Sequence, residues 1–194
     1  RIPNSWDVDE SNQGKISNYS MKFDGISDIV NTTLTPPTGA NDRTISVWFK
    51  TGVNATKNIC GYGTYANKQA FDIMVQATTR KVGVHGVSTP VEAFGVFNFN
   101  EWNHYVATYD GTILRGYLNG QPVNTSTIAL NTGTSVDFTI GSGAYAPFNG
   151  FSGSIDQVSI FDYVLSASQV STLYGNNSAG YFQIGNPMAL TPNP

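Results

Sequence analysis

Few residues of this 194-residue chain have the type and spacing that nucleophilic or zinc-assisted catalysis requires. The only histidines are His85 and His104, and the only cysteine is Cys60. Gly141-Ser142-Gly143 lacks the spacing and the strand-to-helix context of a nucleophile elbow. Cys60 stands in a strand-like apolar run, which is typical of a small buried residue. No zinc-ligand spacing occurs either. We therefore expect that the chain is not an enzyme of these kinds.

Aromatic rings and planar polar groups offer a different chemistry, which is the binding of a sugar. A ring can stack on the C–H face of a pyranose, while carboxylate, amide or guanidinium groups pair with hydroxyls. Six candidate ligand-binding residues are Trp48, Tyr62, Tyr65, Arg115, Tyr117 and Tyr145. Trp48 and Tyr117 should project from strands, whereas the other three tyrosines border glycine-rich loops. For Trp48 and Trp102 a role in packing stays open.

The composition argues against several classes of partner. Charged residues make up 12% of the chain, the net charge is −3, and Arg80-Lys81 is an isolated basic pair, so we expect no nucleic-acid binding. No apolar run approaches the ~18 residues of a membrane span, so we expect no membrane insertion. Abundant uncharged polar residues are typical of proteins exposed outside cells or on a virion surface.

The elements that would position these residues are β-strands joined by tight turns. Strands are predicted at Asn103–Tyr109 and Ile113–Leu118, separated by an Asp110-Gly111-Thr112 turn. A second turn follows at Asn119-Gly120. Asp-Gly and Asn-Gly are strong hairpin signals because these residues adopt positive φ cheaply. Three successive antiparallel strands are therefore expected here.

The same pattern of short strands runs along most of the chain. Thr44–Lys50 alternates most clearly and should direct Ile45, Val47 and Phe49 into the core. Other strands are predicted at Tyr19–Asp24, Ile26–Asn31, Asn58–Tyr62, Ala70–Gln76, Lys81–Val87, Phe94–Phe99, Pro122–Leu130, Val136–Gly141 and Phe151–Tyr163. A capping box at Ser166 to Gln169 predicts one short helix that ends at Gly175. We predict an all-β, two-sheet antiparallel sandwich over residues 17–175, with linker segments at 1–16 and 176–194.

Four segments, in this order and spacing, resemble the laminin-G-like branch of the concanavalin A-like lectin/glucanase superfamily. They are SMKFDG at 20–25, TISVWFK at 44–50, WNHYVATYDG at 102–111 with YLNG at 117–120, and FSGSIDQVSIF at 151–161. The resemblance implies a jelly roll in which the first and last strands are neighbours. The flanking segments and the composition are also similar to laminin-G-like repeats of marine phage virion proteins.

The resemblance also raises two questions about chemistry. Glucanases of this superfamily use a Glu-x-Asp-x-x-Glu strand, but Glu10, Glu92 and Glu101 have no carboxylate two or five residues later, so no glycoside hydrolase is expected. Related jelly rolls often hold a structural Ca²⁺ between the first and last strands. Asp24 and Asp156 match that neighbourhood, and Asp28 could assist. Alternatively, Asp24 closes a turn and Asp156 bonds nearby amides.

The function expected from the sequence is a non-catalytic module that binds a glycan or another host-surface ligand. The site would be the concave face or the rim loops of the sandwich. Such a module would belong to a larger extracellular protein or to a phage tail, fibre or capsid-decoration protein. The alternative is a structural module whose partners are other virion protein chains.

Overall fold

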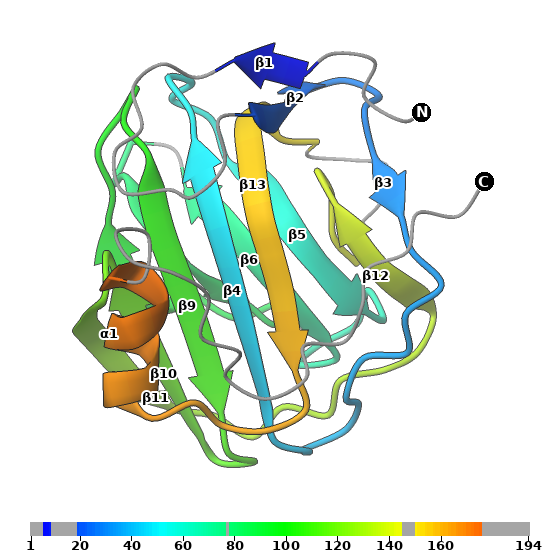
Figure 1. Ribbon diagram of the computed structural model, residues 1–194. Helices are drawn as coiled ribbons and strands as arrows, with labels where there is room; N and C mark the ends of the chain where they lie inside the picture. The colour runs from blue at the N-terminus through cyan, green and yellow to red at the C-terminus, as the bar shows by residue number, and fades with distance from the viewer. Residues whose placement is uncertain (1–5, 9–18, 77, 145–149, 176–194) are drawn as a thin grey trace.

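The computed structural model describes residues 6–8, 19–76, 78–144 and 150–175, which form a two-sheet sandwich (Figure 1). In the front sheet the order is β1 (Trp6–Val8), β2 (Tyr19–Asp24), β13 (Ser152–Phe161), β4 (Arg43–Lys50), β9 (Asn103–Tyr109), β10 (Ile113–Leu118) and β11 (Gln121–Thr127). In the back sheet the order is β3 (Val30–Asn31), β12 (Val136–Ile140), β5 (Lys57–Gly63), β6 (Ala70–Gln76), β7 (Lys81–His85) and β8 (Glu92–Val96). The strand pairs are antiparallel, as in β4 with β9 and β5 with β6, so the predicted sandwich is confirmed.

Two strand predictions and one linker prediction differ from the structure, and a few other strand ends shift by two or three residues. The strand predicted at Ile26–Asn31 is reduced to β3, because the Asp24 carboxylate accepts the amides of Ile26, Ser27 and Asp28 and folds them into a loop. The strand predicted at Phe94–Phe99 lies earlier, as β8. Strand β1 falls inside the predicted N-terminal linker and pairs with β2. The linker predicted at 176–194 lies outside the described residues.

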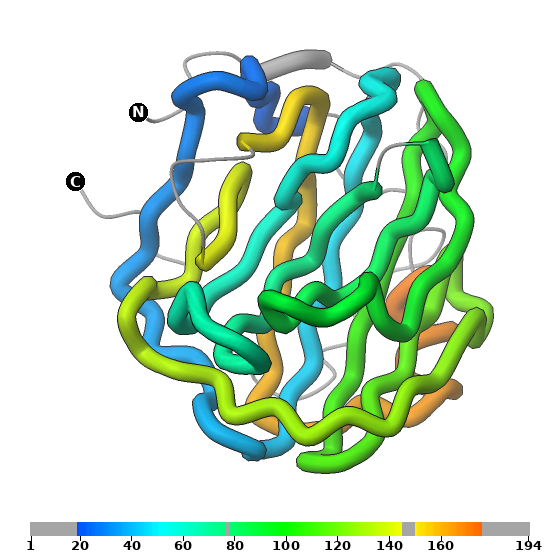
Figure 2. Tube along the Cα trace, turned by 180° about the vertical axis from the view of Figure 1, so that it is seen from behind, coloured from blue at the N-terminus to red at the C-terminus, as the bar shows by residue number. Residues whose placement is uncertain are grey.

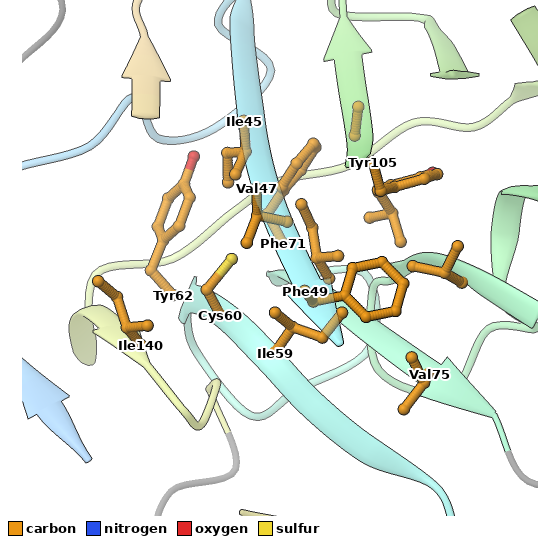
Figure 3. Packing of buried hydrophobic residues seen from close by; sticks show 14 of the residues in the cluster. Ile45, Val47, Phe49, Ile59, Cys60, Tyr62, Phe71, Val75, Tyr105 and Ile140 are labelled. Atoms are coloured by element: carbon orange, nitrogen blue, oxygen red, sulfur yellow. The ribbon is translucent and has the colours of Figure 1, made fainter. Parts of the chain in front are cut away.

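The core lies between the inner faces of the two sheets. Ile45, Val47 and Phe49 of β4 are fully buried there, as their alternation predicted. Figure 3 shows Cys60 among the apolar side chains that surround them. Burial and the charge of Asp72 raise the pKa of the Cys60 thiol far above its usual range. The thiol is therefore a core residue and not a nucleophile.

Two turns and a bulge set the register of the front sheet. Asn119 and Gly120 both have positive φ, at 50° and 76°, as the turn between β10 and β11 requires. At the β9–β10 turn the Asp110 carboxylate instead accepts the amides of Thr112 and Ile113. Strand β13 bulges at Gln157, where φ is 47°, and this shift brings both Ile155 and Ile160 into the core although they are five residues apart.

The C-terminal helix α1 (Ala167–Gly175) begins with the predicted capping box. Ser166 Oγ accepts the amide of Gln169 at 3.3 Å, and Gln169 Oε1 accepts the amide of Ser166 at 2.8 Å. The helix lies against the outer face of the front sheet, over β9 to β11 (Figure 1). Its Val170 packs there with Val106 and Tyr117, so this part of the sheet is covered.

Candidate functional site

A polar groove of about 490 Å³ opens at the end of the sandwich where β4 begins and β13 ends. We call it the rim groove. It is lined by Thr35, Pro36, Pro37, Thr38, Asn41, Asp42 and Asp162. Asp42 precedes β4 and Asp162 follows β13, and the pairing of Thr44 with Phe161 brings these two strand ends together. The groove therefore combines two carboxylates, an amide and hydroxyls with the flat apolar faces of two prolines.

Arg43 holds the loop that lines the groove from its inner side. The side chain is fully buried, and its Nε donates to the carbonyl oxygen of Asn41 at 2.8 Å. One terminal nitrogen donates to the carbonyl of Gly39 at 2.7 Å. The other donates to the hydroxyl oxygens of Thr132 at 2.8 Å and Tyr62 at 3.1 Å. Since four of the five N–H donors are used, the loop has a defined position before any ligand arrives.

Aromatic rings complete the surroundings of the Arg43 guanidinium. Its carbon lies 5.4 Å from the ring centre of Phe71 and 5.2 Å from that of Tyr109. These distances are within the range of cation–π attraction. The Tyr62 hydroxyl, in turn, donates to the carbonyl of Pro37 in the groove wall. Arg43 and Tyr62 thus connect the core of the sandwich to the rim groove.

The sequence analysis did not single out Asp42, Arg43 or Asp162. Asp42 and Arg43 come just before the predicted strand Thr44–Lys50, and Asp162 is near the end of the predicted strand Phe151–Tyr163, but no fixed spacing in the sequence links them. Only the register between β4 and β13 places them at one end of the sandwich. A charged residue beside an alternating strand was the only signal available.

Tyr65 lies at the same end of the sandwich as the rim groove. Thr132 bridges to Gly39 of the groove loop, and Ser135, farther along that segment, has its hydroxyl 2.9 Å from that of Thr64. Figure 2 shows the segment between β11 and β12 running along this end of the molecule. Tyr65 is 55% exposed, so of the predicted aromatic residues that the structure describes it is the accessible one.

The other predicted ligand-binding aromatics are buried where the structure describes them. Trp48 is 2% exposed, and its ring stacks on His104 at 4.9 Å and on Tyr174 of α1 at 5.6 Å. Tyr62 belongs to the core, and Tyr117 packs beneath α1. This burial contradicts the expected role of these three rings as stacking surfaces and supports the packing alternative left open for Trp48.

The two remaining predicted ligand residues have different outcomes. Arg115 forms an ion pair with Asp110, with 2.8 Å between Nη1 and Oδ2, on the outer face of β10. Tyr145 lies outside the described residues. Arg115 does not line the rim groove.

A buried serine–histidine pair lies on the outer face of the front sheet. Ser46 Oγ is 2.7 Å from His104 Nε2. His104 Nδ1 is buried without a hydrogen-bond partner in the described part of the chain, so no carboxylate orients the ring. Burial lowers the pKa of His104 to about 3, which keeps the ring neutral. The pair is covered by aromatic rings and is best explained as part of the packing.

The carboxylates predicted for calcium do not converge. Asp24 pairs in register with Ser152, so Asp156 lies four residues farther along β13, roughly 13 Å away. Oδ1 of Asp24 already accepts amides of its own loop, and these bonds lower the pKa of Asp24 to about 2. Among the described residues, no cluster of three histidine, cysteine or acidic side chains could hold a metal ion. The geometry therefore does not fit one Ca²⁺ shared by Asp24 and Asp156.

One further buried carboxylate does not line the rim groove. Asp72 of β6 is 1% exposed, and its Oδ1 accepts the amide of Ala144 at 2.9 Å. Burial raises the pKa of Asp72 to about 7. Gly61 and Gly143 pack so closely that an added Cβ would lie 2.2 and 2.6 Å from the Asp72 carboxyl group. Asp72 therefore fastens the segment after β12 to the back sheet.

Comparison with known protein families agrees with this architecture. A family model described as the concanavalin A-like lectin/glucanases superfamily, of the laminin-G type, matches residues 24–171. The chain belongs to this superfamily. The match spans β3 to β13 and both strand ends that form the rim groove. The similarity to marine phage virion repeats stays a prediction. A comparison with curated protein sequences finds no match.

Solved structures of this superfamily fold are similar at low sequence identity. Domain 4 of AbnA, an extracellular arabinanase from Geobacillus stearothermophilus in complex with arabinotriose, has a TM-score of 0.65 at 17% identity, covering 88% of this chain and 80% of that one. The CBM40 of Ruminococcus gnavus IT-sialidase, bound to α2,3-sialyllactose, has a TM-score of 0.61 at 18% identity, covering 80% and 96%. A pentraxin from Limulus polyphemus has a TM-score of 0.58 at 19% identity, covering 79% and 80%. At these identities the likeness establishes the fold.

Proposed function

We propose that this domain is a non-catalytic carbohydrate-binding module whose ligand binds in the rim groove. The observation that carries the proposal is the groove itself, which brings hydrogen-bonding groups of several kinds to one end of a rigid sandwich. The carboxylates accept hydrogen bonds from sugar hydroxyls, whereas the amide and hydroxyl groups both donate and accept. The faces of Pro36 and Pro37 can contact the C–H groups of a sugar ring.

Two further observations support the proposal. The groove loop is held by the buried Arg43, so little conformational entropy is lost when a ligand binds. Two structures of the same fold were determined with oligosaccharides, arabinotriose in one and sialyllactose in the other. Tyr65, exposed at the same end, offers a ring on which a longer glycan could stack.

The proposal includes a setting. The module would belong to a larger protein displayed outside a cell or on a virion, because its surface is polar but weakly charged. Among the described residues, no helix has the length and apolarity needed to cross a membrane. The rival function is a structural module that contacts other protein chains.

A glycan array tests the proposal directly. The wild-type domain is compared with Asn41→Ala, which removes an exposed amide from the groove, and with Asn31→Ala, a matched exposed change on β3. We expect wild type and Asn31→Ala to retain the same glycans and Asn41→Ala to bind them at least several-fold more weakly. A folded domain that retains no glycan would favour the rival function. If Asn41→Ala binds the same glycans as tightly as the wild type, the binding site lies outside the rim groove.

A further inference from the structure

The charged side chains that line the rim groove are both acidic. Asp42 and Asp162 line it from two different strand ends, and none of its seven lining residues is basic. Both aspartates are exposed, so a bound ligand would meet their carboxylates directly. A carboxylate on the ligand would therefore meet like charges with no cation beside it.

Neither Arg43 nor Arg115 supplies that cation. The guanidinium of Arg43 is fully buried on the inner side of the groove loop, where backbone carbonyls and hydroxyls take four of its five donors. The positive charge of Arg43 reduces the negative potential of the groove, but the buried guanidinium cannot contact a ligand. Arg115 is paired with Asp110 on another face.

We propose that the rim groove selects neutral sugars and rejects acidic ones such as sialic or uronic acids. The inference rests on the proposed function, because it assigns a ligand class to the same groove. Discrimination by repulsion needs no additional contact with the preferred ligand, since a like charge in the site is enough to exclude a competitor. The preferred glycan is then an oligosaccharide of pentoses or hexoses without a carboxylate.

Matched glycan pairs test this specificity. Lactose and α2,3-sialyllactose differ by one sialic acid, and methyl-esterified oligogalacturonides are the neutral counterparts of the free acids. Affinities are measured by calorimetry for every pair in which an array detects binding to at least one member. We expect the neutral member to bind about tenfold more tightly than the acidic one at low salt, with the gap shrinking as salt is added.

Charge variants connect the discrimination to the groove. Asp42→Asn and Asp162→Asn keep the side-chain shape and remove the charge. Each should therefore reduce the difference in affinity between the neutral and the acidic glycan of a pair. Asp137→Asn is the matched control, because Asp137 is an exposed aspartate on β12 that does not line the groove. It should leave the gap unchanged.

The outcomes separate this inference from the proposed function. Binding of neutral members, with a gap that the two groove variants narrow, supports both. Equal or tighter binding of acidic members leaves the carbohydrate-binding function standing and overturns the specificity. A gap that Asp137→Asn changes as much as the groove variants also overturns it. The absence of binding to any glycan, neutral or acidic, overturns the proposed function itself.

Discussion

Replacement of Arg43 tests how the core supports the rim groove. A simple sum over its four hydrogen bonds, at about 1.5–3 kcal/mol for each bond to a charged group, would give roughly 6–12 kcal/mol. Such a sum counts every acceptor as lost. In the Arg43→Met variant most of the acceptors have another hydrogen-bond partner, so the expected loss of unfolding free energy is smaller.

Three of the four acceptors keep or regain a partner in the Arg43→Met variant. The Gly39 carbonyl still accepts the amide of Thr132 at 3.1 Å. The Tyr62 hydroxyl still donates to Pro37, and the carbonyl of the exposed Asn41 can turn to water. Only the hydroxyl of Thr132 is stranded, at a cost of about 1–3 kcal/mol. With the loss of the ring contacts, we expect Arg43→Met to lower the free energy of unfolding by about 2–4 kcal/mol.

Arg43→Lys should cost at least as much, although it keeps the charge. An ammonium group is more strongly hydrated than a guanidinium, has three donors instead of five, and cannot lie flat between the rings of Phe71 and Tyr109. Urea unfolding of wild type and both variants measures the order. A Lys variant within about 0.5 kcal/mol of wild type would show that a point charge suffices and would refute the role assigned to the planar fork.

Two carboxylates provide the remaining predictions. Because the pKa of Asp72 is raised to about 7, the folded chain retains a proton that the unfolded chain releases near 3.8. The free energy of unfolding should therefore fall as the pH rises from about 4 to 7, by at most about 1.4 kcal/mol per pH unit. Urea unfolding at several pH values measures this slope, and Asp72→Asn should remove it. Asp24 behaves oppositely, since its lowered pKa of about 2 adds stability above about pH 4 that is lost on further acidification. Asp24→Ala should cost about 1 kcal/mol, comparable to the loss of a capping residue. Excess chelator should leave the wild-type melting temperature unchanged, and a fall of several degrees would restore the calcium hypothesis.

The strands could be predicted from the sequence because their signals are local. The bounds of β6, β9 and β10 match the prediction, and the capping box of α1 has the expected bonds in both directions. The error at Ile26–Asn31 arose where a side chain competes with strand pairing. At Asp24 the carboxylate takes the amides that a strand would need, and no periodicity in the sequence reports that competition.

The candidate site was predictable only in part, because exposure depends on contacts between distant segments. The alternation around Trp48 correctly placed its ring on the outer face of β4, but it could not show that Tyr174, more than a hundred residues later, stacks on the same ring. Likewise, the sequence shows Arg43 as a charged residue at the start of a strand, but it does not show that the side chain is buried.

The coverage of the front sheet by α1 is one reason to propose the rim groove as the site. Two of the rings that the sequence suggested for ligand binding, Trp48 of β4 and Tyr117 of β10, lie on the outer face of the front sheet, and the helix packs against them there. A glycan could bind there only if it displaced Val170 and the rings stacked on Trp48. Opening that contact would expose apolar surface at about 25 cal/mol per Å², a cost that a sugar in the rim groove avoids. The groove is already open and its loop is already held, so the same hydrogen-bonding energy would yield tighter binding there.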